Sequence, residues 1–429
     1  MPPMATDPPT TARLHLYRWN ERPVVSVALL AMAAGFGQFG AVAALGDVAR
    51  HFGHLTGGTT LGEQAGLSAT ELGIGLAILR LASLGGFPLA GLADRFGRRR
   101  LMLAACAAGL AVTMVAAASP SYWWFVIIFA VGRPLLSATT AVAQVSAAEQ
   151  TASFQRTRAV ALIAAGYGVG AGLTAILHSL ASSALGFRGL FLLAIVPLLA
   201  LPLIGRWVTE PDRFTVAVAA PHEHPLPVLG PISPRFRRRL IVVGALTFAV
   251  SIVTGPANSF FFIYAQNVIR LSGVVTASLV ALAGATGLAG LLTGRWLADR
   301  FGRRPTAAGA MVAMALTGML TYSGSRPAAA VGYLIAVLAA SAFAPAAGAL
   351  ANELFPTSVR ASVAGWQIAA GVLGATAGLL VFGAVADVGN RFGVAAVVVF
   401  ALAIPASCLF LLVPETRGKE LEELWPEDS

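Results

Sequence analysis

The feature that most constrains this chain is a series of long apolar stretches separated by short polar intervals. Twelve of them are long enough for a bilayer-spanning helix, which needs about 20 mostly apolar residues. They lie at residues 24–49, 69–93, 101–118, 121–146, 157–180, 187–206, 240–266, 274–298, 305–324, 328–350, 361–385 and 393–413. Only 11% of the residues are charged, whereas a soluble domain has about 25%. We therefore predict an all-α membrane protein with 12 transmembrane helices.

A polar interval rich in proline and arginine divides the spans into two groups of six. We expect five parts: a cytoplasmic N-terminal tail, an N-terminal half, a cytoplasmic linker, a C-terminal half and a cytoplasmic C-terminal tail. Their bounds are 1–23, 24–206, 207–239, 240–413 and 414–429.

The basic residues are distributed unevenly among the intervals. With the N-terminus inside, 22 of them fall in inside segments and five in outside loops, which leaves only Arg80 and Arg133 within spans. The positive-inside rule then places both termini in the cytoplasm of a multi-pass protein of the cell membrane. The same distribution explains the net charge of +10 without a nucleic-acid partner, and predicts contacts with anionic lipids.

The two halves share charged landmarks. The octapeptide Leu-Ala-Asp-Arg-Phe-Gly-Arg-Arg occurs at 92–99 and again at 297–304. Further landmarks recur at nearly the same distance: Glu149 and Arg156 with Glu353 and Arg360, and Glu210 with Glu415. This register indicates two tandem six-helix halves in parallel orientation.

These motifs resemble those of the major facilitator superfamily, and the resemblance covers essentially the whole chain. The segment 352–360 is similar to a superfamily signature between helices 10 and 11. The tail 414–424 resembles that of sugar porters and related organic-ion transporters. The resemblance implies a secondary transporter that works by alternating access around a central site.

The resemblance also implies a gate at the cytoplasmic ends of the helices. In the first half, Asp94 and Arg98 would meet Glu149 and Arg156 and so hold the halves in one state. The alternative is that the arginines only fix topology and contact anionic lipid. The full set of expected gating residues is Asp94, Arg95, Gly97, Arg98, Glu149, Arg156, Asp299, Arg300, Gly302, Arg303, Glu353 and Arg360.

Arg80 and Arg133 are the charges that lie deep within spans. An arginine at mid-bilayer costs about 2.5–3.5 kcal/mol on insertion scales, which makes a function the default interpretation. We expect both to bind an anionic substrate, because a guanidinium matches a carboxylate with two hydrogen bonds. For Arg133, a structural bond to backbone carbonyls or to Gln38 is an equal alternative.

Further polar side chains in the spans are candidates for substrate binding. They are Gln38, Asn258, Tyr264 and Tyr167, although packing is the safer interpretation of Tyr167. No carboxylate accompanies the two deep arginines, which weakens the case for proton coupling. Asp47, near the outer end of the first span, is kept as a weak candidate for it. We expect His178 to lie at the outer interface.

The sequence thus predicts a carrier of a small organic anion, such as a carboxylate metabolite, with coupling to protons left open. A sugar or polyol carrier and a drug efflux antiporter are the alternatives. A receptor would append a cytoplasmic domain, for which the linker is too short. Since no span carries a His/Asp/Glu cluster, we expect no enzyme activity, cofactor or metal, and we expect a monomer.

Overall fold

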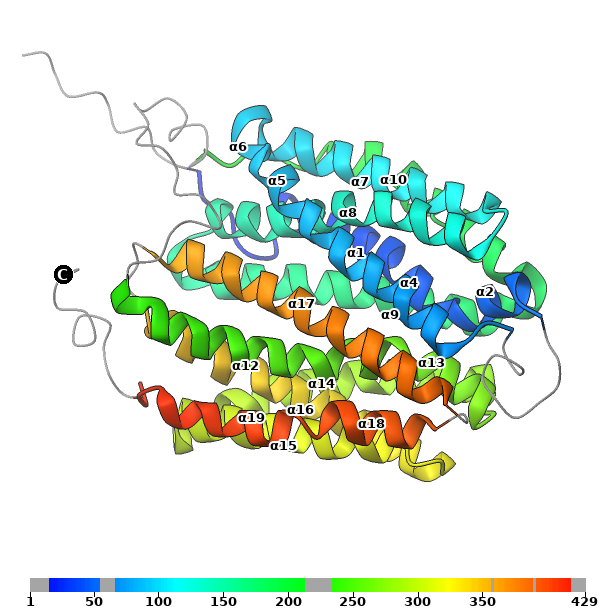
Figure 1. Cartoon of the computed structure of the whole chain (residues 1–429). Helices are drawn as coiled ribbons and strands as arrows, with labels where there is room; N and C mark the ends of the chain where they lie inside the picture. Colours follow the sequence, from blue (N-terminus) through cyan, green and yellow to red (C-terminus); the bar gives the residue numbers. More distant parts are fainter. Residues whose placement is uncertain (1–14, 55–65, 213–233, 356–358, 389–390, 418–429) are drawn as a thin grey trace, which may run out of the picture.

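The computed structural model describes residues 15–54, 66–212, 234–355, 359–388 and 391–417. Within these residues, all regular elements are helices, and the β-structure consists of an isolated bridge between Tyr17 and Thr151. The long helices form two bundles that lie side by side, with the N-terminal one above the C-terminal one in Figure 1.

In the N-terminal bundle, one span is divided into three short helices, α4, α5 and α6. A 3-10 turn at Ser83–Gly85 joins α4 to α5. The longest helix, α9, joins the fifth and sixth predicted spans across a kink at Gly186, where φ is +59°. The helices of this bundle are α1 (Arg22–Ala43), α2 (Leu45–Phe52), α4 (Ala69–Ala82), α5 (Gly86–Gly91), α6 (Ala93–Phe96), α7 (Arg98–Val115), α8 (Tyr122–Gln150), α9 (Ser153–Leu192) and α10 (Ile195–Gly205).

The C-terminal bundle repeats this plan. Its helices are α12 (Pro234–Ser259), α13 (Phe261–Ile263), a π-helical turn (Tyr264–Val268), α14 (Gly273–Phe301), α15 (Arg303–Thr321), α16 (Arg326–Glu353), α17 (Arg360–Asp387), α18 (Phe392–Phe400), α19 (Ala403–Ala406) and a 3-10 turn (Ser407–Leu412).

The predicted all-α membrane fold with two sets of six spans is confirmed. In the described part of the chain, eleven helical segments are long and apolar enough to cross a bilayer. The remaining predicted span, 305–324, corresponds to α15, which begins with Arg303 and Arg304 and is therefore less apolar over its length. The predicted first span, 24–49, is broken at Ala44 between α1 and α2.

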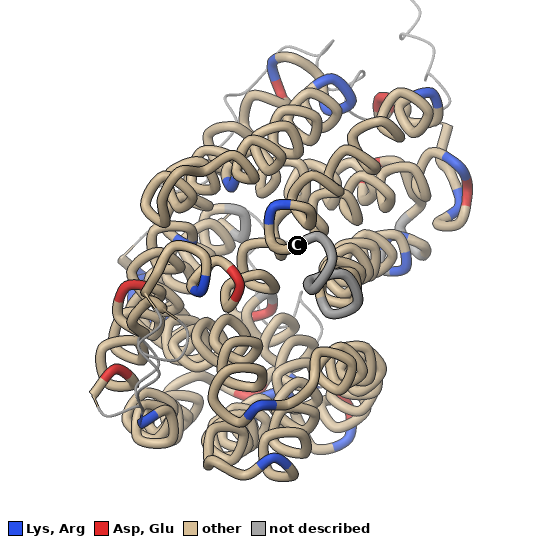
Figure 2. Tube along the Cα trace, turned by 90° about the vertical axis from the view of Figure 1, so that its right-hand side faces the viewer, with Lys and Arg blue, Asp and Glu red and all other residues tan. Residues whose placement is uncertain are grey.

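The charged residues gather at the ends of the bundles. Figure 2, a view along the helices, shows that most of the trace carries no charge. The ends that carry the arginines of 95–100, 235–239 and 295–304 lie on the left in Figure 1, and we call this side the basic end. The side that carries α2 is called the opposite end.

The two bundles approach each other closely at the opposite end, where α4 packs against α17. Oδ1 of Asp387 accepts a hydrogen bond from the N–H of Ala69 at 3.1 Å, and its Oδ2 accepts one from the hydroxyl of Thr70 at 3.0 Å. Glycines make this approach possible, since a Cβ at Gly383 would lie 2.5 Å from the carbonyl oxygen of Ala69. The helix backbones thus touch where larger residues would separate them.

This close approach predicts the effect of adding one methyl group. Gly383→Ala forces α4 and α17 apart, and we expect it to lower the free energy of unfolding by about 1–3 kcal/mol. Thermal unfolding of the detergent-solubilised protein measures the change. The matched control is Gly284→Ala in α14, where a Cβ would meet nothing within 4 Å and helix propensity favours alanine. Equal stability of the two variants would contradict the packing that we describe.

Candidate functional site

A cavity of about 350 Å³ lies between the bundles, at the junction of α4, α12 and α17. Its single charged lining residue is Arg80 of α4. The C-terminal bundle contributes polar groups, namely the side chains of Thr247, Ser251, Thr254 and Gln367. The cavity therefore combines one guanidinium from one bundle with hydroxyl and amide groups from the other. Sequence reasoning had singled out only Arg80 among these residues.

The two deep arginines lie in one electrostatic environment. The charges of Arg80 and Arg133 are near enough to repel each other, and both also interact with the phenol of Tyr167. Nη1 of Arg133 donates to the backbone oxygen of Gln38 at 3.1 Å, the kind of bond that the structural alternative predicted. Among the described residues, the guanidinium of Arg80 has no hydrogen-bond or ion-pair partner. The positive charge at the centre of the protein is thus left without a neutralising carboxylate.

Some buried donors near these arginines also lack partners. Gln38 is 5% exposed, and its Nε2 makes no hydrogen bond. Its Oε1 lies 3.5 Å from the hydroxyl of Tyr167, at the limit of a hydrogen bond. Nε of Arg133 is likewise buried and unpaired. Since a buried polar group without a partner costs about 1–3 kcal/mol, this arrangement favours a ligand that supplies acceptors.

Of the candidates in the C-terminal bundle, Asn258 lies near the cavity and Tyr264 does not. Asn258 lines a second cavity of about 200 Å³, together with Thr254, which lines both cavities. Tyr264 is 1% exposed, and its hydroxyl accepts a hydrogen bond from the N–H of Gly324 at 2.8 Å near the opposite end. The structure thus brings Asn258, but not Tyr264, next to a residue of the central cavity.

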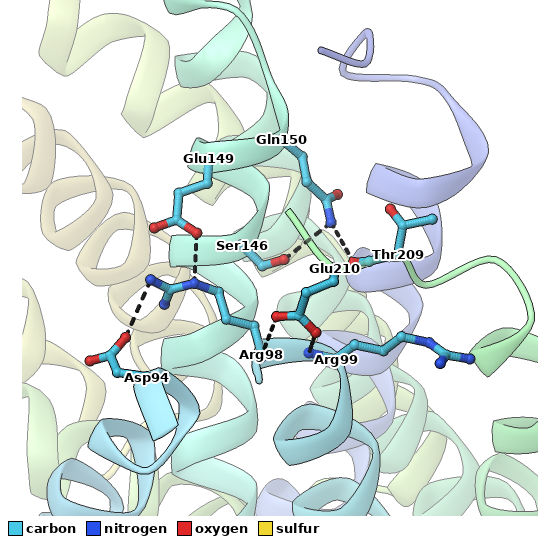
Figure 3. Close-up of polar contacts among 8 residues, drawn as sticks. All are labelled: Asp94, Arg98, Arg99, Ser146, Glu149, Gln150, Thr209 and Glu210. Atoms are coloured by element: carbon cyan, nitrogen blue, oxygen red, sulfur yellow. Dashed lines mark hydrogen bonds and ion pairs between the residues drawn. The ribbon is translucent and has the colours of Figure 1, made fainter. Parts of the chain in front are cut away.

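At the basic end, Arg98 lies between two carboxylates (Figure 3). Its Nε is 2.6 Å from Oε2 of Glu149, and its Nη2 is 3.4 Å from Oδ1 of Asp94. Arg156 points elsewhere, because its Nε donates to the carbonyl of Ala148 at 3.1 Å. Asp94, Arg98 and Glu149 all belong to the N-terminal bundle, so these two ion pairs tie helices within one half.

The repeat of this cluster in the C-terminal bundle is partial. Nη2 of Arg303 is 2.9 Å from Oε1 of Glu353, as in the first half. Asp299 instead lies 3.8 Å from Arg295, and both side chains are exposed. The side chain of Arg360, which was also expected here, lies outside the described part of the structure.

Two of the expected gating arginines contact aromatic rings. Arg95 lies over the ring of Phe96, and Arg300 lies over the rings of Trp296 and Phe301. These side chains are exposed. Arginine and aromatic side chains together are typical of the membrane interface. For Arg95 and Arg300, this placement favours a role in fixing the membrane topology and contacting lipid over a role in gating.

Glu210 has a structural role that sequence reasoning missed. Its carboxylate accepts hydrogen bonds from the backbone N–H groups of Arg98 at 2.5 Å and Arg99 at 3.0 Å (Figure 3). It thereby caps the start of α7, where a negative charge is favoured by the helix dipole. The turn before α7 needs Gly97, since its φ is +92° and a Cβ would lie 3.2 Å from Glu210.

The C-terminal bundle repeats this cap. Glu415 accepts hydrogen bonds from the N–H groups of Arg303 and Arg304, each at 3.0 Å, and Gly302 has φ of +111°. The signal was present in the sequence, because Glu210 and Glu415 are spaced like the two octapeptides. The repeated spacing thus reflects a duplicated helix cap that ties the end of each half to its third span.

A buried ion pair lies at the opposite end. Nε2 of His178 is 2.8 Å from Oδ2 of Asp47, and the His178 side chain is 2% exposed. His178 thus lies near the end of its span but is covered by protein. Arg50 pairs with the same carboxylate. Burial by itself raises the pKa of Asp47, but the hydrogen bond and charge of His178 and the charge of Arg50 outweigh it, and the pKa lies below its ordinary value.

The cap at Glu415 predicts a pH-dependent stability. Burial raises the pKa of Glu415, but hydrogen bonds from the backbone N–H groups of Arg304, Arg303, Arg417 and Thr416 lower it by more. A lowered pKa means that the stabilisation is present above the ordinary glutamate value and is lost as pH falls through the folded-state value.

We therefore expect Glu415→Gln to be less stable than the parent by about 1 kcal/mol at neutral pH, a value that allows for solvent screening. The difference disappears in acid. Thermal unfolding over a pH series measures it. Asp299→Asn, which removes an exposed charge at the same end, is the control and should change little at any pH. A Glu415→Gln deficit that persists in acid would rule out the charged cap.

Comparison with known proteins identifies the family to which this chain belongs. Residues 27–297 match the family model described as Major Facilitator Superfamily, and residues 229–427 match the one described as Sugar (and other) transporter. The chain is 25% identical over 380 residues to the "Probable 4-methylmuconolactone transporter" of Cupriavidus pinatubonensis, a match that covers 85% of this chain and 86% of that protein.

Solved structures show the same fold. The inward open conformation of the xylose transporter XylE from E. coli matches with a TM-score of 0.71 and 19% identity, over 95% of this chain and 99% of that one. The nucleoside transporter NupG matches with a TM-score of 0.72 and 13% identity, over 91% and 99% of the two chains.

Proposed function

This chain is a membrane transporter that belongs to the major facilitator superfamily, and we propose that it carries a small organic anion, a carboxylate metabolite, by alternating access. The observation that carries this proposal is the pair Arg80 and Arg133, whose charges lie together at the centre with no carboxylate beside them among the described residues. An anion between the bundles would supply the missing negative charge and acceptors.

The similar transporter from Cupriavidus supports this class of substrate. Its name gives 4-methylmuconolactone, a small compound that carries a carboxylate. The central cavity of about 350 Å³ is of a suitable size for such a metabolite. The proposed anchor is Arg80, with Ser251, Thr254 and Gln367 as hydrogen-bonding partners from the second bundle.

The second candidate is a sugar or polyol carrier. It is favoured by the match of residues 229–427 to the sugar transporter model and by the uncharged polar groups around the cavity. These groups would bind hydroxyls in place of a carboxylate. In that case Arg80 and Arg133 would act as hydrogen-bond donors, and charge on the substrate would bring no advantage.

We further propose that the basic end faces the cytoplasm and that this arrangement is closed at the other side. The excess of arginines at that end supports the orientation. The contact of Ala69 and Thr70 with Asp387 joins the two bundles at the opposite end. In alternating access this contact would have to break when the outer side opens.

Proton coupling would use the pair Asp47 and His178. A histidine can gain or lose a proton near neutral pH, and His178 holds the pKa of Asp47 low in this arrangement. Separation of the two side chains would therefore raise the proton affinity of Asp47 and link protonation to rearrangement. The pair lies next to the bundle boundary, because a Cβ on the neighbouring Gly46 would be 2.9 Å from Oδ1 of Asn267 in the other bundle.

The central prediction concerns Arg80. Arg80→Gln keeps a hydrogen-bonding side chain but removes the charge, so uptake of carboxylates into proteoliposomes should fall at least tenfold in kcat/KM, the equivalent of about 1.4 kcal/mol. Arg95→Gln, which removes an exposed arginine outside the cavity, should leave uptake within about twofold. A panel of carboxylates and sugars identifies the substrate class.

Carboxylate uptake that survives Arg80→Gln would contradict the anion site. Sugar uptake by the parent protein, unaffected by Arg80→Gln, would favour the sugar carrier instead.

A separate prediction concerns coupling. Asp47→Asn cannot hold the charged pair with His178, so we expect it to lose accumulation driven by an inward proton gradient. Exchange of labelled for unlabelled substrate, which needs no net proton movement, should persist. Asp299→Asn, which removes an exposed carboxylate at the basic end, is the control for the gradient measurement. If Asp47→Asn accumulates substrate like the parent, Asp47 is not the coupling group.

A further inference from the structure

Three of the few arginines at the opposite end gather around one pocket of about 530 Å³. Arg270 follows the π-helical turn, Arg326 begins α16, and Arg391 precedes α18. These residues come from three separate connections, yet all line the same pocket. We call it the arginine pocket, and its polar lining is Tyr264, Arg270, Tyr322, Ser323, Arg326 and Arg391.

The part of the chain that the structure describes does not balance the positive charges of this pocket. Among the described residues, no ion pair joins Arg270, Arg326 or Arg391 to a carboxylate. The acidic group at this end of α17, Asp387, is already bonded to Ala69 and Thr70 of the other bundle. Like charges around one pocket repel one another, and an anion between them would offset this repulsion.

The backbone holds two of these arginines in defined positions. Arg270 has φ of +54°, a left-handed conformation that residues other than glycine rarely adopt. The N–H of Leu271 donates to the carbonyl of Ala265 at 2.7 Å and keeps this turn closed. Nε of Arg326 donates to the carbonyl of Ile269 at 3.0 Å, which leaves its terminal N–H groups available. Strained backbone of this kind is often found at binding sites.

We propose that the arginine pocket binds the anionic group of a ligand, a phosphate or a carboxylate. Guanidinium groups match both with paired hydrogen bonds, and the exposed hydroxyl of Ser323 adds a donor. The group comes either from the headgroup of an anionic lipid or from a soluble organic anion outside the membrane. This site is separate from the central cavity and does not depend on the identity of the transported substrate.

Isothermal titration of the full-length protein in nanodiscs of neutral lipid tests the proposal. The protein carries Arg80→Gln, so that the central cavity does not contribute to binding. The probes are dioctanoyl phosphatidylglycerol for the lipid source and citrate for the soluble source. We expect at least one probe to bind, and Arg326→Gln with Arg391→Gln to weaken that binding at least tenfold. Arg188→Gln, another arginine of the opposite end, should bind like its parent.

The pattern of binding identifies the source. Loss of phosphatidylglycerol binding in the pocket variant assigns a lipid headgroup, and loss of citrate binding assigns a soluble anion. The proposal is overturned if neither probe binds the parent, or if every probe that binds the parent binds the pocket variant with unchanged affinity. Should the double variant fail to fold, Arg391→Gln alone replaces it, because the described contacts include no hydrogen bond from that side chain.

Discussion

The structure depends on one constraint, which is that lipid offers no hydrogen bonds to the groups it surrounds. Many span hydroxyls accordingly bond within their own helix, as Thr139 does to the carbonyl of Leu135 and Thr376 to that of Val372. Charges gather at the helix ends, where water and headgroups solvate them. Against this background, the buried nitrogen atoms of Gln38 and Arg133 that lack partners support the proposed binding of an anion at the centre.

The same constraint explains why the ends of the two halves are built alike. A helix that begins at the membrane boundary has backbone N–H groups without partners. Glu210 and Glu415 satisfy them at the starts of α7 and α15, and each comes from the end of its own half. The repeated sequence thus forms the same helix cap in both halves. The ion pairs of Arg98 and Arg303 with Glu149 and Glu353 add a further link within each half.

The sequence predicted what depends on local composition or on register. The spans follow from length and hydropathy, and the depth of Arg80 and Arg133 follows from the helical rise. The pairing of Asp47 with His178 could not be read from the chain, because the two residues are 131 positions apart and neither lies in a repeated motif. Thr247, Ser251 and Gln367 were missed because hydroxyl and amide groups in a span more often bond their own helix. Only the crossing of α4, α12 and α17 brings them around one cavity with Arg80.

The placement of Arg80 also bears on how binding could drive a rearrangement. Its guanidinium belongs to one bundle, whereas the hydroxyl and amide groups of the same cavity belong to the other. A bound anion would therefore contact both bundles at once, and its charge would relieve the repulsion between Arg80 and Arg133. A ligand shifts a conformational equilibrium only through different affinities for the two states. A substrate held between the bundles meets this condition, because the distance between its two sets of contacts changes whenever the bundles move relative to each other.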